Sequence, residues 1–193
     1  TISTDRLGVG IKIDLKKYYI LNGNELMVIL TNFLLSKKKL NRSCFIASTI
    51  VSTPILKKMA KVFKVEYKES LTGFKWIGKM IKDYPKNQFI GGGEESYGYL
   101  VGNFVRDKDA ITSSLLACEL GSECKEKNET IFNYLIDCYI KFGFYKEKLI
   151  SIEKRGIAGQ NEINDIMKKL RKSNVQHLAG NKIKYVYDYK TSI

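Results

Sequence analysis

The sequence has one histidine, His177, and four cysteines among its 193 residues. The cysteines form no C-x-x-C pair, and each lies in an apolar segment: Cys44, Cys118, Cys124 and Cys138. A structural zinc ion needs four Cys or His ligands, so a single histidine and scattered cysteines do not indicate a zinc site. We expect reduced cysteines in the core of a cytosolic protein in preference to disulfides.

Long hydrophobic runs are also missing. The longest, from Leu26 to Leu35, is interrupted by Thr31 and Asn32, whereas a membrane-spanning helix needs about 20 consecutive apolar residues. The first residues lack the basic and apolar segments of a secretory signal. With 44% apolar residues, typical of a globular core, we expect a soluble cytoplasmic protein with no membrane partner. The lack of an initiator Met leads us to expect a fragment of a longer protein.

Acidic residues are fewer than basic ones, 20 against 33, which gives a formal net charge of +13. The lysines occur in short groups such as Lys37-Lys38-Lys39, with no long basic arm and no nucleic-acid-binding motif. We interpret most of them as solvated helix faces, and the positive field is also compatible with a doubly charged substrate. A nucleic-acid-binding module is an alternative that rests on charge alone, and we predict no nucleic-acid partner.

Hydrophobic periodicity predicts strands alternating with helices. We expect strands over 6–15, 44–51, 65–69, 88–91 and 182–189, and helices over 25–37, 54–63, 74–82, 107–120, 128–144 and 161–171. Gly121 is expected to end the helix over 107–120. Such alternation indicates an α/β fold, in which helices cover both faces of a parallel or mixed sheet.

Three loops between predicted elements carry polar residues, and α/β sheets bind ligands at the carboxyl ends of their strands. The first, at 91–98, reads Gly-Gly-Gly-Glu-Glu-Ser-Tyr-Gly. Its glycines let the backbone approach a ligand closely, and a carboxylate accepts hydrogen bonds from neighbouring sugar hydroxyls. Gly-Glu stretches are also common in solvated turns, so this composition alone leaves both interpretations open.

The second loop, at 105–110, reads Val-Arg-Asp-Lys-Asp-Ala and places two cations at the start of a helix, which suits an anion. The alternative is an Asp-capped helix with surface ion pairs. The third, at 71–76, reads Leu-Thr-Gly-Phe-Lys-Trp and brings a hydroxyl, a glycine and a lysine to a strand-to-helix turn. The alternative there is an N-cap threonine beside core aromatics.

A fourth segment, Ser-Thr-Asp-Arg-Leu-Gly at 3–8, resembles the end of the metal-binding loop of the α-D-phosphohexomutases, which include phosphoglucomutases and phosphomannomutases. That loop reads Asp-x-Asp-x-Asp-Arg before an apolar-Gly stretch. The three loops above resemble the substrate-binding segments of this family, in the same order. Tyr145–Lys148 and Val186–Tyr189 resemble the longer phosphoglucomutases, so the resemblance covers nearly the whole chain.

The resemblance implies a three-layer α/β/α mixed sheet of the phosphohexomutase type, comprising the end of domain II and domain III. It assigns 1–22 to the tail of the metal-binding domain II, 23–150 to the sugar-binding domain III, and 151–193 to a connection toward domain IV. The implied activity is interconversion of hexose 1-phosphate and hexose 6-phosphate through hexose 1,6-bisphosphate. A phosphoserine and Mg²⁺ serve this reaction in the family.

By the same resemblance, each candidate site residue has a role. Glu94 and Ser96 hold sugar hydroxyls, Arg106 and Lys108 meet phosphate, and Thr72, Gly73 and Lys75 line the cleft. Asp5 is a metal ligand, and Arg6 faces the phosphoryl group. The catalytic candidates are therefore Arg6 and Lys108. The matched motif gives Glu95 no sugar contact.

The sequence departs from the family at the metal loop. It has Thr1, Ser3 and Asp5 where the family has three aspartates, which predicts weak Mg²⁺ binding because this ion prefers several hard oxygen ligands. The phosphoserine segment and the last phosphate loop fall outside the chain, so we expect the isolated chain to be inactive. A catalytically inactive sugar-phosphate-binding remnant is the alternative to a mutase.

Overall fold

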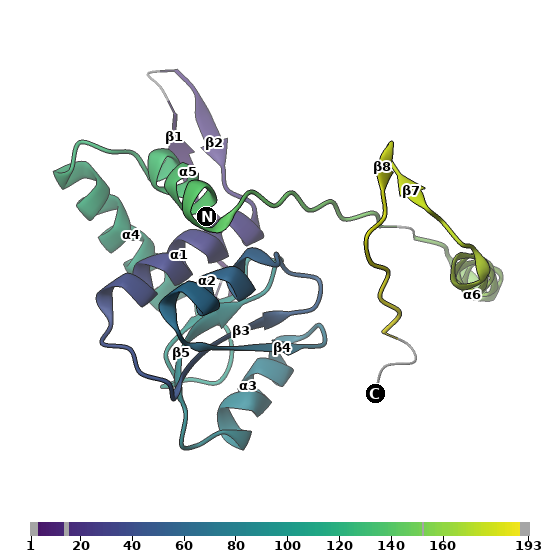
Figure 1. Cartoon of the computed structure of the whole chain (residues 1–193), viewed down its shortest axis with the longest axis horizontal. Helices are drawn as coiled ribbons and strands as arrows, with labels where there is room; N and C mark the ends of the chain where they lie inside the picture. Colours follow the sequence, from purple (N-terminus) through teal and green to yellow (C-terminus); the bar gives the residue numbers. More distant parts are fainter. Residues whose placement is uncertain (1–3, 14–15, 152, 190–193) are drawn as a thin grey trace. The chain divides into compact units, whose positions relative to one another are not determined.

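The structure is a computed structural model that describes residues 4–13, 16–151 and 153–189. The chain divides into two compact units, the first reaching Glu147 and the second beginning at Lys148 (Figure 1). Within the described ranges, no helix combines the length and the apolar content that a membrane span requires.

A four-stranded mixed sheet forms the centre of the first unit. Its strands are β3 (Cys44–Thr49), β4 (Glu66–Ser70), β5 (Gln88–Gly93) and β6 (Tyr99–Val101). Their order is β4-β3-β5-β6; β3 pairs in parallel with β4 and β5, and β6 runs antiparallel to β5. Every residue of β3 is buried, as expected for a central strand that is covered on both faces.

Helices cover both faces of this sheet. Side chains along a strand point alternately to its two sides, so each face presents its own apolar residues. Phe45 and Ala47 face α3 (Phe74–Asp83) and pack with its Phe74 and Ile77. Cys44 and Ile46 belong to the larger core on the other face. That core is formed with α1 (Gly23–Lys37), α2 (Ile55–Phe63), α4 (Ala110–Glu126) and α5 (Ile131–Phe142). Figure 1 shows α3 on the opposite side of the sheet from α1 and α2. The predicted three-layer α/β/α architecture is confirmed.

A short antiparallel ribbon precedes α1. It consists of β1 (Gly10–Lys12) and β2 (Tyr18–Ile20), and Ile11 of β1 is buried in the larger core. The predicted strand over 6–15 is therefore too long among the residues that are described, and β2 was not predicted. A three-residue strand is too short to show a period of two.

Two further features differ from the sequence prediction. Gly121 does not end a helix, because α4 continues through it to Glu126. A Cβ at Gly121 would lie 3.5 Å from the Ile131 side chain, an ordinary packing distance. Cys44, Cys124 and Cys138 are buried as predicted, but Cys118 on α4 is exposed, so its expected place in the core is wrong.

The second unit contains α6 (Gly156–Lys172) and a two-residue pairing of β7 (His177–Leu178) with β8 (Asn181–Lys182). Helix α6 begins earlier than predicted, and Gly159 is its one buried residue. The strand predicted over 182–189 is wrong for the described residues beyond Lys182. Its alternation comes from Tyr185, Tyr187 and Tyr189, whose successive rings lie 6.1 and 6.3 Å apart along an irregular segment.

Candidate functional site

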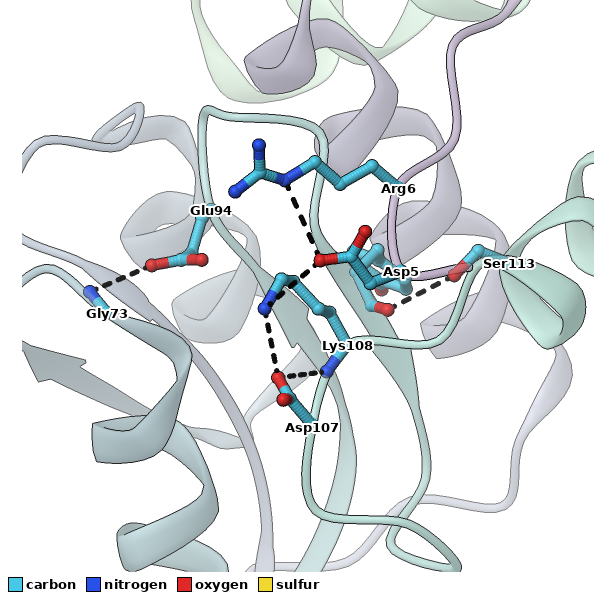
Figure 2. Close-up of polar contacts among 8 residues, drawn as sticks. Asp5, Arg6, Gly73, Glu94, Asp107, Lys108 and Ser113 are labelled. Atoms are coloured by element: carbon cyan, nitrogen blue, oxygen red, sulfur yellow. Dashed lines mark hydrogen bonds and ion pairs between the residues drawn. The ribbon is translucent and has the colours of Figure 1, made fainter. Parts of the chain in front are cut away.

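Glu94 lies at the end of β5, where the structure holds its carboxylate in one orientation. The residue is buried, with 8% of its surface exposed. Its Oε1 accepts a hydrogen bond of 2.9 Å from the Gly73 N–H, and its own N–H donates to the Gly98 carbonyl at 2.8 Å, closing the loop. Among the described residues none donates to its Oε2. Glu94 therefore presents a fixed carboxylate with one oxygen able to accept a hydrogen bond (Figure 2).

The glycines around Glu94 allow close packing within the protein. A Cβ at Gly92 would lie 2.1 Å from the Ala47 carbonyl oxygen on β3. A Cβ at Gly98 would lie 2.7 Å from Cδ of Lys108 and 3.6 Å from Oε2 of Glu94. We expected these glycines to let the backbone approach a ligand closely. They also have a second role, because the absence of a Cβ lets the sheet and the Lys108 stem pack tightly around the loop.

Lys108 brings a positive charge beside this loop. Its side chain is only 16% exposed, and Nζ lies 3.2 Å from Oδ1 of Asp107 and 3.4 Å from Oδ2 of Asp5. The Nζ is also 5.7 Å from the centre of the Phe74 ring. Arg6 shares the same Asp5 oxygen, with its Nε 4.0 Å away. Figure 2 shows the end groups of Arg6, Glu94 and Lys108 around one space.

The start of α4 fixes the backbone next to Lys108. The Asp109 side chain accepts hydrogen bonds from the N–H groups of Ile111 and Thr112, at 3.1 and 3.3 Å, and from the Thr112 hydroxyl at 2.6 Å. Burial raises the pKa of Asp109, but these hydrogen bonds outweigh it and the pKa is lowered. The Asp109 N–H and the Ser113 hydroxyl both donate to the Tyr99 carbonyl. The Asp-capped helix expected as an alternative is present, and Lys108 still faces the site.

The remaining predicted residues are less buried than Glu94. Thr72, Lys75 and Arg106 are exposed, and Ser96 is half-buried. The Lys75 ammonium lies 5.3 Å from the Trp76 ring centre. The structure therefore brings together Asp5, Arg6, Gly73, Glu94 and Lys108. The roles of all the candidate site residues stay predictions.

Glu95 has a role that the sequence did not indicate. Its Oε2 accepts hydrogen bonds from the hydroxyls of Thr49 and Ser52 at 3.3 and 3.4 Å. Its carbonyl also touches the first turn of α1, because a Cβ at Gly23 would lie 1.9 Å from the Glu95 oxygen. Glu95 therefore supports the loop that carries Glu94. Its partners lie at the end of β3 and in the turn that follows it, and no local motif marks them.

The described residues do not fit a Mg²⁺ site. No group of three His, Cys, Asp or Glu side chains that could hold a metal ion occurs among residues 4–13, 16–151 and 153–189. Asp5 is flanked by the cations of Lys108 and Arg6, which disfavours a further cation beside it. Thr1 and Ser3, the other two positions of the predicted loop, lie outside the described residues.

Known proteins resemble the chain both in sequence and in fold. A family model described as phosphoglucomutase/phosphomannomutase, alpha/beta/alpha domain III, matches residues 22–139. Phosphoglucomutase of Staphylococcus aureus strain USA300 is 36% identical over 189 residues, which are 97% of this chain and 34% of that protein. Phosphoglucomutase of the bovine strain RF122 is 37% identical over 89% of this chain and 31% of that protein. The chain thus spans about a third of the length of the curated relatives it matches.

Two solved structures share the fold. Parafusin, a phosphoglucomutase from Paramecium in its open form, aligns with a TM-score of 0.64 and 24% identity over 96% of this chain and 31% of its own. A putative phosphomannomutase from Thermus thermophilus aligns with a TM-score of 0.54 and 19% identity over 64% of this chain and 26% of its own. Together with the family match over residues 22–139, these findings show that the chain belongs to the phosphoglucomutase/phosphomannomutase family.

Proposed function

We propose that this chain supplies the sugar-binding part of a cytoplasmic phosphohexomutase. Such an enzyme is an intramolecular phosphotransferase that interconverts hexose 1-phosphate and hexose 6-phosphate through hexose 1,6-bisphosphate. The observation that carries the proposal is the buried carboxylate of Glu94, held by Gly73 near the side chain of Lys108. A carboxylate next to a cation suits a ligand that carries both hydroxyls and phosphate.

In this proposal the residues share the work of positioning and charge neutralisation, which dominate phosphoryl transfer. Oε2 of Glu94 accepts a hydrogen bond from a sugar hydroxyl, and Ser96 binds a neighbouring hydroxyl. Lys108 and Arg6 neutralise phosphate charge. Arg106, Thr72 and Lys75 complete the phosphate side of the cleft. Because the described residues do not fit Mg²⁺, no step is assigned to a metal.

A second candidate is a sugar-phosphate-binding protein without turnover. The ion pair between Asp5 and Lys108 favours it, because the one described carboxylate of the metal loop is already balanced by a cation. Both candidates bind hexose phosphates. Turnover of glucose 1-phosphate by the complete gene product separates them.

Titration of the 193-residue chain with glucose 1,6-bisphosphate, followed by NMR of its amide groups, tests the proposal. Glu94→Gln keeps the size of the side chain and an oxygen for the Gly73 N–H, but it removes the negative charge. Hydrogen bonds to charged groups contribute about 1.5–3 kcal/mol, so we expect binding to weaken at least about tenfold, the ratio that ~1.4 kcal/mol gives.

The matched control is Glu126→Gln at the exposed end of α4, which makes the same change in charge. It should leave affinity within about twofold, a difference of less than ~0.5 kcal/mol. Glu95 is unsuitable as a control because it holds Thr49 and Ser52. Equal affinity of wild type and Glu94→Gln would refute the assignment of the sugar site.

A further inference from the structure

Asp5 and Lys108 form the contact on which this inference rests. Nζ of Lys108 lies 3.4 Å from Oδ2 of Asp5, and Nε of Arg6 lies 4.0 Å from the same oxygen. The two ion-paired side chains differ in exposure: Asp5 is 42% exposed and Lys108 only 16%. The carboxylate thus faces solvent on one side, while the ammonium that balances it is largely shielded.

Lys108 is held in place along its whole length. Its backbone N–H and its Nζ both contact the Asp107 carboxylate, at 2.8 and 3.2 Å. Its Cδ packs against Gly98, where an added Cβ would lie only 2.7 Å away, and its ammonium lies 5.7 Å from the centre of the Phe74 ring. Contacts on several sides already restrict the rotamers of Lys108. Forming the ion pair therefore costs less side-chain entropy than it does for an exposed surface pair.

A divalent cation at Asp5 would meet this ammonium at close range. Two cations that share one carboxylate oxygen repel each other strongly in a partly shielded site, where screening by water is reduced. The carboxylate also gains less from a metal ion when an ammonium already balances its charge. Lysine and metal are therefore competitors for the same oxygen of Asp5.

We propose that Lys108 is the resident counter-ion of Asp5 in this chain, so that a divalent cation binds at Asp5 only by displacing the Lys108 ammonium. The family resemblance makes Asp5 a metal ligand, whereas here it orients the lysine of the loop at 105–110. By linkage the exclusion is reciprocal: a phosphate that draws Lys108 away from Asp5 raises the metal affinity of Asp5 by the same factor that the metal raises phosphate affinity.

A titration with Mn²⁺ alone tests the competition without any sugar, so its outcome is independent of the site proposed at Glu94. The readout is paramagnetic broadening of the amide signals of Leu7 and Gly98 in the 193-residue chain. We expect Lys108→Met to lower the Mn²⁺ concentration needed for half-broadening at least about tenfold, a change of ~1.4 kcal/mol. Lys108→Arg keeps a cation beside Asp5 and should behave like wild type.

Two controls locate the effect. Lys125→Met, on the exposed surface of α4, removes the same charge and should change the half-broadening concentration less than about twofold. Adding Asp5→Asn to Lys108→Met should abolish the gain. If Lys108→Met fails to fold, Lys108→Gln replaces it, and we expect the same result for that variant. The proposal is overturned if removal of Lys108 gains no more than Lys125→Met, or if the gain survives Asp5→Asn.

Discussion

The two units of the chain use their apolar residues in different ways. The first buries large side chains completely, including Phe33, Phe45 and Phe89. In the second, Leu149, Ile157 and Val186 are all more than three-quarters exposed, the last at 77%. Helices α4 and α6 each have 17 residues, yet five residues of α4 are buried and one of α6. Every residue that the structure brings together at the site belongs to the first unit, where burial fixes side-chain geometry.

The largest expected effect contrasts the cores of the two units. Phe45 is fully buried, with its ring centre 5.2 Å from that of Phe89, so Phe45→Ala should lower the free energy of unfolding by about 3–5 kcal/mol. Val186→Ala, at an exposed position, should change it by less than about 0.5 kcal/mol. Urea denaturation followed by fluorescence of the single tryptophan, Trp76, measures the first unit, and circular dichroism follows both. Similar losses for both variants would break the comparison.

A smaller effect contrasts two carboxylates. Glu95 is half-buried and accepts from two hydroxyls, whereas Glu162 in α6 pairs with Lys154 across 2.9 Å at the surface. Glu95→Ala should cost about 1–3 kcal/mol, because the hydroxyls of Thr49 and Ser52 lose a charged acceptor. Glu162→Ala should cost about 0–1 kcal/mol. Denaturation of both variants under identical conditions measures the difference, and a larger loss at Glu162 would contradict the assigned role of Glu95.

The sequence predicted the elements that carry local signals. Asn22 caps α1 in a reciprocal pair with Glu25, and Pro54 directly precedes α2, so both helices were placed within two residues of their observed starts. Strand β6 and the continuation of α4 past Gly121 were not predicted. A three-residue strand forms only because it pairs with β5, and α4 continues because it packs against α5. Both contacts join segments that are separated along the chain, so a local sequence pattern does not reveal them.

The candidate site also combines residues that the sequence predicted with contacts that it did not. Glu94 and Lys108 were placed from the composition of their loops and from the family resemblance, and the structure brings them together. The ion pair of Lys108 with Asp5 and the support that Glu95 receives from β3 were not predicted. Both join segments that are distant in sequence, and neither residue type reveals its partner. The sequence identified the charged residues of the site, but the folded structure was needed to show which of them form ion pairs or accept hydrogen bonds.

The smallest effect contrasts the starts of α4 and α6. Asp109 caps α4 through its carboxylate, while Arg155 precedes α6 without a side-chain cap. Asp109→Ala should therefore cost about 1 kcal/mol at neutral pH, and Arg155→Ala should cost less than about 0.5 kcal/mol. Denaturation of the two variants at neutral pH gives this difference.

The pH dependence of the α4 cap follows from its charge. The pKa of Asp109 is lowered from its ordinary 3.8, by hydrogen bonds that overcome the effect of burial. Its contribution is therefore complete above the unfolded pKa and is lost as pH falls through the lower folded pKa. Asp109→Asn keeps a capping oxygen but cannot titrate. The stability of wild type relative to Asp109→Asn should fall between about pH 5 and about pH 2. A difference that stays constant over this range would show that the carboxylate does not stabilise α4 through its charge.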